Sequence, residues 1–373
     1  MSEETFVREL GRRAEEVAGA PLDFEAVRGR AVRIRRRRRL GAAVAVVAVV
    51  AAVVAPFALA GGPDDSAPDP APAPRPAPGS SVLHDRVLTR PDGTTVRLDV
   101  DNADVLELGV LTDGRVVAAL QEPYAIRVYS PDGAVQATYP PAYNTITMSA
   151  SDNAAAWVGE DLRVRVLTSG TAEPAVLGAI PMPGDDAGSI DAVVDPSHLL
   201  VGDHTTTTGV LTPDGITDLA APEPFRVEDV SPDGGLWAVT FVPTADHEQY
   251  GCFGLYDPEA GTITQRACDA APLGFAPDGK HVLTGYPENN MVGSAQVLDL
   301  DLRTVATVTP PDGSAVSRID WADATHLLAA VADLATNDWT LDRVDAETGE
   351  QEAVAGRTGG VNPEMGAEYV FSE

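Results

Sequence analysis

Lysine is nearly absent from this chain of 373 residues, since Lys280 is the only one. Lys280 lies in a turn motif, so Schiff-base chemistry, which needs an activated lysine, is not expected. Histidine and cysteine are also scarce, with six and two residues that form no HxH, HExxH or CxxC spacing. A GxSxG sequence and a phosphate-binding glycine–lysine loop are absent as well. The sequence therefore predicts no catalytic residue, no metal site and no cofactor.

Basic residues are few outside the N-terminal segment. Residues 1–40 contain eleven Arg and seven acidic residues, a net charge of +4, although the whole chain has a formal net charge of -30. The remainder carries 15 basic and 49 acidic groups, a net charge of -34. A body this acidic repels nucleic acid and anionic lipid, so neither is a predicted partner of it.

One long apolar run is present, at residues 41–60, GAAVAVVAVVAAVVAPFALA. Twenty helical residues span about 30 Å, the hydrocarbon thickness of a bilayer. Seven Arg lie between Arg28 and Arg38, directly before the run, and positive charge stays on the cytoplasmic side. We therefore expect a single-pass membrane protein with a cytoplasmic N-terminus and an extracytoplasmic C-terminal domain. The alternative is a cleaved signal peptide, because Ala58-Leu59-Ala60 resembles a cleavage site.

The segment after the apolar run, residues 61–80, contains seven Pro. Such a composition favours extended polyproline II, a stiff spacer. Four regions are thus predicted: an Arg-rich cytoplasmic helical segment (1–40), a transmembrane helix (41–60), a Pro-rich linker (61–80) and an extracytoplasmic domain (81–373).

A turn followed by a β-like apolar run recurs along the last region. The first series of turns contains Asp113, Asp152, Asp195, Asp233, Asp278 and Asp323, at spacings of 38 to 45 residues. A second series falls about halfway between, at Asp92, Asp132, Gly170, Asp214, Glu259, Asp301 and Glu347. Two hairpins per ~40 residues are typical of a four-stranded propeller blade. The second series has seven members, which predicts an all-β, seven-bladed β-propeller.

The first series lacks a seventh member before the chain ends. We therefore expect residues 361–373 to supply the inner hairpin of one blade and residues 81–100 its outer hairpin. Strands from the N- and C-terminal ends of the domain would then close the ring and remove its open edges.

The best-formed turns are Ser231-Pro232-Asp233-Gly234 and Ala276-Pro277-Asp278-Gly279. Their pattern resembles the WD40-like repeat of the TolB family of bacterial propellers. In this pattern an apolar residue is followed by Ser or Ala, then by Pro-Asp-Gly, and then by a β-like run. The resemblance covers residues 81–373, although only these two of the six inner turns contain the full Pro-Asp-Gly. It implies the propeller fold much more strongly than any function.

Both series of turns should lie on one face of a propeller, which leaves the B–C and D–A loops on the other face for function. Tyr and Asn suit adaptable binding surfaces. The predicted binding rim contains Tyr124, Tyr143, Asp185, Asp186, His204, Asp246, His247, Tyr250, Tyr286, Asn289 and Asn290. A metal site at His204 and His247, each preceded by Asp, is a weaker hypothesis. Ordinary polar loop composition is the alternative to a functional rim.

Cys252 and Cys268 lie at equal distances from residue 260, within the DPEAG turn. This symmetry predicts a structural cross-strand disulfide on the outer hairpin of the fourth blade, permitted in an oxidising compartment. Two reduced, buried thiols are the alternative. His198, His281 and His326 each follow a turn Asp by three residues, which indicates a structural role.

The predicted function is a non-catalytic binding or sensing module for a protein or cell-envelope ligand. A propeller-type extracytoplasmic hydrolase or lactonase is one alternative. A second is transmembrane signalling in the manner of anti-sigma factors, in which residues 1–40 bind a cytoplasmic partner. Residues 1–40 contain neither His nor Cys, so the zinc-binding motif of those proteins is missing.

Overall fold

The computed structural model describes residues 79–180, 188–203, 205–241, 252–268, 270–288, 291–360 and 368–372. All of them belong to one compact unit, Pro72–Glu373. The predicted cytoplasmic segment, membrane span and most of the Pro-rich linker lie outside the described residues. Among those residues, no helix is long and apolar enough to cross a membrane.

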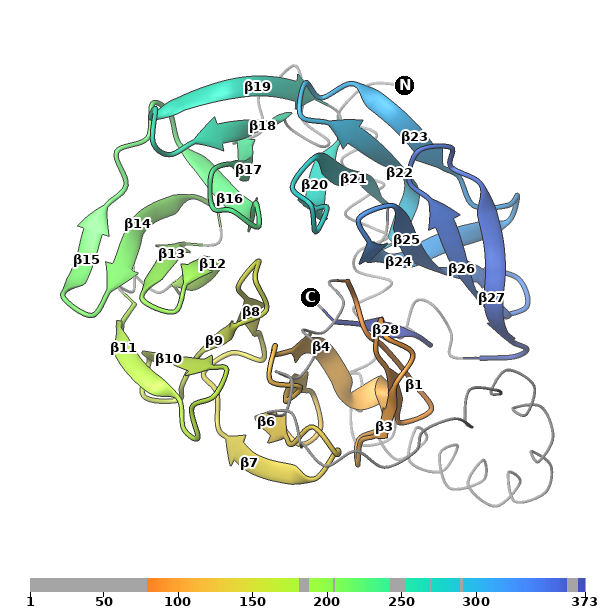
Figure 1. Cartoon of the computed structure of the whole chain (residues 1–373), viewed down its shortest axis with the longest axis horizontal. Helices are drawn as coiled ribbons and strands as arrows, with labels where there is room; N and C mark the ends of the chain where they lie inside the picture. The colour runs from red at the N-terminus through yellow and green to blue at the C-terminus, as the bar shows by residue number, and fades with distance from the viewer. Residues whose placement is uncertain are drawn as a thin grey trace, which may run out of the picture. The chain divides into compact units, whose positions relative to one another are not determined.

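The described strands form a seven-bladed β-propeller, in which four-stranded antiparallel blades surround a central channel (Figure 1). From the channel outward, the strands of each blade are named A to D. Blades 1 to 3 contain β4 (Val105–Val110), β5 (Val116–Leu120), β6 (Ala125–Tyr129) and β7 (Val135–Tyr139); β8 (Thr147–Met148), β9 (Ala154–Val158), β10 (Arg163–Thr168) and β11 (Ala175–Ala179); and β12 (Ser189–Asp195), β13 (His198–Gly202), β14 (Thr207–Thr212) and β15 (Gly215–Asp218). Blades 4 to 6 contain β16 (Phe225–Val230), β17 (Trp237–Phe241), β18 (Cys252–Asp257) and β19 (Thr262–Cys268); β20 (Ala271–Phe275), β21 (His281–Glu288), β22 (Met291–Asp299) and β23 (Thr304–Val308); and β24 (Ser314–Asp323), β25 (His326–Asp333), β26 (Trp339–Asp345) and β27 (Gln351–Arg357). Blade 7 contains β28 (Val370–Phe371), β1 (Val82–His84), β2 (Val87–Thr89) and β3 (Thr95–Arg97), and a 3-10 helix, η1 (Asn102–Asp104), precedes blade 1.

Each predicted turn lies where the spacing placed it. The first series forms the A–B turns of blades 1 to 6, and the second forms the C–D turns of all seven blades. These turns share one face of the ring, here called the turn face. The B–C loops and the D–A connections between blades lie on the opposite face, here called the loop face.

The ring closes in blade 7 through strands from both ends of the domain, as predicted, but the division differs. Residues 81–100 supply three strands rather than one outer hairpin, and the described C-terminal residues supply only β28. The extra hairpin turns at Asp85 and Arg86, with φ of 48° and 67°. A two-residue turn with positive φ at both positions normally contains Gly or Asn, so this hairpin gave no recognisable signal.

The short strand β28 is held firmly because its side chains alternate between two cores. Val370 packs with Leu83 and Leu108 between blades 7 and 1. Tyr369 and Phe371 pack with Trp339 between blades 6 and 7. All three side chains are buried, so the C-terminal segment of blade 7 packs against both neighbouring blades, 6 and 1.

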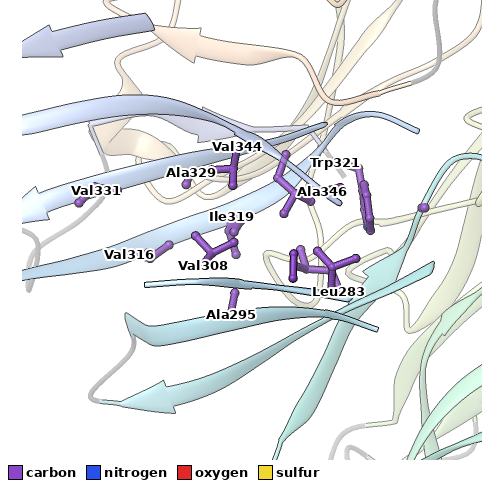
Figure 2. Packing of buried hydrophobic residues seen from close by; sticks show 14 residues of the cluster. Leu283, Ala295, Val308, Val316, Ile319, Trp321, Ala329, Val331, Val344 and Ala346 are labelled. Carbon is purple, nitrogen blue, oxygen red and sulfur yellow. The ribbon is translucent and has the colours of Figure 1, made fainter. Parts of the chain in front are cut away.

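The spaces between blades are filled mainly by small aliphatic side chains. Figure 2 shows the largest cluster, in which Leu283 and Val308 of blade 5 face Val316, Ala329 and Val344 of blade 6. The B strands carry many Ala and Val residues, and β5 and β9 are buried along their whole length. Small side chains allow the blades to approach one another near the axis, which explains how a chain with 5% aromatic residues fills its core.

The predicted disulfide is present in blade 4. Cys252 of β18 and Cys268 of β19 are bonded, and they are directly paired across the C–D hairpin. The bond therefore covalently joins the two outer strands of this blade.

Candidate functional site: the loop face and the central channel

The turn face is a scaffold held by its aspartates. Asp233 accepts a hydrogen bond from the backbone N–H of Gly235 (3.0 Å), and Asp323 accepts one from that of Thr325 (2.8 Å). Burial acts to raise the pKa of Asp323, but hydrogen bonds from Thr325 and His326 lower it to about 2. These two turns thus use their carboxylates to hold their own backbone.

Three histidines belong to this scaffold. Each is the first residue of the B strand of its blade: His198 begins β13, His281 begins β21 and His326 begins β25. Nδ1 of His198 lies 2.9 Å from Asp195, and Nδ1 of His326 lies 3.1 Å from Asp323. Two of the three imidazole rings therefore contact the aspartate of their own turn.

The predicted rim on the loop face is only partly described. Tyr124 is 55% exposed on the B–C loop of blade 1, while Tyr143 is partly buried and lines the channel. Tyr286 lies on β21, where the structure describes the backbone. The remaining predicted rim residues, including both histidines of the metal hypothesis, lie outside the described residues: Asp185, Asp186, His204, Asp246, His247, Tyr250, Asn289 and Asn290.

Two further exposed apolar residues lie on B–C loops: Leu162, like Tyr124, is the last residue of its loop, and Leu334 is the first residue of its loop. Leu162 of blade 2 is 37% exposed and Leu334 of blade 6 is 48% exposed. Blades 6, 7, 1 and 2 follow one another around the ring (Figure 1). The loop face therefore carries an exposed large apolar group on each of blades 6, 1 and 2, while the B–C loop of blade 7 between them is Asp85-Arg86.

The central channel encloses a cavity of about 1880 Å³ whose wall combines apolar side chains with several acidic ones and three arginines. The A strands contribute Glu107, Asp191, Asp229 and Asp320, and the A–B turn of blade 2 contributes Asp152. Burial raises the pKa of Glu107, Asp152 and Asp229 to about 7 and that of Asp320 to about 6. The charge of Asp320 raises the pKa of Asp152 and Asp229 further, so carboxyls of blades 2, 4 and 6 act on one another across the channel.

Several of these carboxylates tie one blade to the next. Glu107 Oε2 accepts a hydrogen bond from the backbone N–H of Ile146 (2.6 Å), and Asp229 Oδ2 accepts one from that of Phe275 (2.7 Å). Asp320 accepts one from the hydroxyl of Ser80. In each case the donor belongs to the strand or segment that begins the following blade.

Asp191 makes the same kind of link through a hydroxyl group. Its Oδ2 accepts a hydrogen bond from Thr207 Oγ1 (2.7 Å), and Thr207 Oγ1 accepts one from the backbone N–H of Val227 (2.8 Å) in blade 4. Hydrogen bonds of this kind contribute more when the acceptor is charged. The channel acids therefore hold the ring together.

Arginines balance part of this charge. Arg226 Nε lies 3.8 Å from Asp191 Oδ1, and its Nη1 lies 3.7 Å from Glu228 Oε2. Arg318 of blade 6 donates to the carbonyl of Leu106 in blade 1 (3.1 Å) and lowers the pKa of Glu107. Arg318 thus reaches past the short strand β28 inside the channel.

A separate ionic cluster lies where the ends of the ring meet. His84, Asp85 and Glu368 place potential ligand atoms within 4.8 Å of one another. Arg357 Nη1, however, lies 2.7 Å from Glu368 Oε1 and 2.8 Å from Asp85 Oδ1, and supplies the positive charge that these carboxylates need. The geometry fits an ion-pair network that joins blades 6 and 7. His84 lies on β1, the second strand of its blade, whereas the outer hairpin predicted for residues 81–100 would place it on an outer strand; that placement was wrong.

Sequence reasoning missed the channel acids, although one signal was present. Asp191 and Asp229 both lie on A strands and precede the turn Asp of their blades by four residues. Arg357 and Asp85 gave no such signal because they are separated by 272 residues and meet only through ring closure.

No protein-family model matches the chain, and no curated protein is significantly similar to it. The fold and the site therefore define the protein as a seven-bladed β-propeller with acidic side chains in its channel and exposed apolar groups on its loop face.

Proposed function

We propose that this protein is a non-catalytic binding or sensing module that engages a protein or cell-envelope ligand through the loop face. One observation carries the proposal. Exposed large apolar side chains, those of Tyr124, Leu162 and Leu334, lie at equivalent B–C loops on the face opposite the turns. Exposed apolar groups gathered on one face are typical of interaction surfaces.

The setting of this module is part of the proposal. The apolar run 41–60, with arginines before it and a Pro-rich segment after it, supports a single-span anchor that displays the propeller outside the cell. The Ser/Ala-Pro-Asp-Gly turns and the propeller fold support a TolB-like origin. The disulfide is consistent with an oxidising compartment.

Site-specific photo-crosslinking in producing cells tests the binding face. A photoreactive residue replaces Tyr124 or Leu334 on the loop face of the full-length chain, and Asp214 or Glu259 on the turn face serves as the matched control. The proposal predicts an adduct of the same mass from both loop-face positions and none from the controls. Equal labelling of the two faces, or no adduct from the loop face, would contradict it.

Metal analysis of the purified protein provides an independent test against catalysis. Stoichiometric calcium or zinc would favour the hydrolase alternative, because a metal in an acidic channel can activate water. The binding module predicts metal at background level after dialysis.

A further inference from the structure

Leu162 combines an unfavourable backbone conformation with an exposed apolar side chain. Its φ is 61°, in the left-handed region that favours Gly, and its side chain is 37% exposed. Such conformations persist where the surrounding structure imposes them, and they concentrate at functional sites. Leu302, with φ of 58° on the turn face, differs because its side chain packs against a buried cluster that contains Leu298.

The loop that presents Leu162 is rigid. The N–H of Leu162 donates to the carbonyl of Gly159 (2.9 Å), and the N–H of Gly159 donates to the carbonyl of Arg163 (2.9 Å). Arg165 pairs with Asp161 (3.0 Å) over the start of the loop. A Cβ at Gly159 would lie 2.5 Å from Arg165 Nε, so glycine makes room for this pair. The backbone at Leu162 is therefore held by hydrogen bonds before any partner arrives, which lowers the entropic cost of ordering the loop on binding.

Tyr124 and Leu162 are connected through one segment, here called the strap (residues 140–142). The Tyr124 hydroxyl donates to the carbonyl of Ala142 (3.1 Å). The N–H of Ala142 donates to the carbonyl of Val158 (2.9 Å), and Pro141 forms a bridge with Gly159. The strap thus links the B–C loop of blade 1 to that of blade 2, and the two exposed side chains belong to one continuous surface.

Acidic side chains outnumber basic ones around this surface, where Arg163 is exposed next to Leu162 and Arg165 pairs with Asp161. Glu122 precedes Tyr124 by two residues, and Glu160 and Asp161 precede Leu162 in its own loop; all three are exposed. The chain outside the first 40 residues carries a net charge of -34. An approaching partner therefore meets an apolar centre in a negative field, which attracts cationic groups and repels anionic ones.

We propose that Tyr124, the strap and Leu162 form an anchoring site for a polypeptide segment that presents an apolar side chain flanked by Lys or Arg. This inference rests on the proposed function of the loop face and specifies the partner class. The apolar side chain packs between Tyr124 and Leu162, and the cationic residues face Glu122, Glu160 and Asp161. Rigid aromatic and aliphatic anchors ringed by polar groups are typical of interface hot spots.

The decisive variant is Leu162→Gly in the purified full-length protein, because glycine relieves the left-handed conformation while removing the side chain. The probe is a fluorescent peptide of alternating Leu and Lys, with a Leu–Glu peptide of equal length for comparison. We expect Leu162→Gly to raise the melting temperature and to weaken binding of the Leu–Lys peptide about tenfold or more. Tyr124→Ala should weaken binding to a similar degree. The Leu–Glu peptide should not bind.

Leu302→Gly is the matched control, since it changes the same residue type at the same φ on the opposite face. It should leave peptide affinity unchanged. If both glycine variants bind the Leu–Lys peptide as tightly as the unmodified protein does, the peptide binds only through non-specific electrostatic attraction and the inference is overturned. If both glycine variants bind the peptide normally but loop-face crosslinks form in cells, only this inference fails and the proposed function stands. If no loop-face crosslinks form, the proposed function itself is contradicted.

Discussion

Arg357 and Glu368 form an ion pair across the seam of the ring, with Arg357 Nη1 2.7 Å from Glu368 Oε1. Glu368 is buried, and it also lies 3.1 Å from His84 Nε2. Tyr369 stacks on the His84 ring at 4.7 Å. The first and last parts of the domain are thus joined by charge as well as by strand pairing.

The first prediction concerns this pair. Glu368→Gln keeps the size of the side chain but removes the charge that Arg357 faces. We expect it to lower the free energy of unfolding by about 1.5–3 kcal/mol, the contribution of a hydrogen bond to a buried charged group. Urea unfolding of the full-length protein measures the change. Arg343→Gln, which breaks the exposed pair with Asp323, is the control and should cost about 1 kcal/mol or less. Equal losses would show that the seam has no special role.

The second prediction concerns pH. Glu107, Asp152 and Asp229 have a pKa raised by burial to about 7, and Asp320 to about 6, whereas unfolded carboxyls titrate near 4. Between these values the folded state binds more protons than the unfolded state. Stability should therefore fall as pH rises from about 4 to about 7, and then level off. A melting temperature that is higher at pH 8 than at pH 5 would contradict this assignment.

The third prediction isolates one of these carboxyls. Asp152→Asn removes a charge that burial and Asp320 disfavour, and Asn tolerates its φ of 53°. We expect the variant to be more stable than the unmodified protein at pH 8, by about 2–4 kcal/mol, and we expect this difference to shrink as the pH falls and to vanish near pH 4. Asp214→Asn, at an exposed C–D turn, should leave the pH profile unchanged. Thermal melts over this pH range provide the comparison.

The fourth prediction concerns the disulfide. Cys252 and Cys268 close a loop with a sequence separation of 16 residues. Loop-closure entropy predicts a contribution of about 3 kcal/mol to stability. The double variant Cys252→Ser, Cys268→Ser should show this loss in urea unfolding while its circular dichroism spectrum stays the same. Reducing agent should destabilise the unmodified protein equally and should not affect the variant.

Most of the fold could be predicted because a propeller repeats local information. Each blade needs a turn at the same two corners, so Asp113, Asp233 and their equivalents fall into register along the chain. The disulfide was visible for the same reason, since a hairpin places symmetric positions opposite each other. Local hydrogen bonding of Asp to its own turn leaves a direct mark on the sequence.

The candidate site was less predictable because its contacts are long-range. Glu107 contacts Ile146, Tyr124 contacts Ala142, and Glu368 contacts Arg357 only after the blades assemble. Composition could point to Tyr124 as an exposed aromatic residue, but the left-handed position of the Gly159–Leu162 turn is occupied by Leu and not by Gly. The division of blade 7 was missed because the Asp85-Arg86 turn also lacks Gly.

The position of β28 has a consequence for biosynthesis. A ribosome makes β1 to β3 early, and their innermost neighbour consists of residues 370 and 371, near the end of a chain of 373. Those three strands must wait, with one edge unpaired, through the synthesis of six complete blades. A chain that lacks Val370 and Phe371 cannot complete blade 7. Synthesis of these two residues is therefore the step that allows the ring to close.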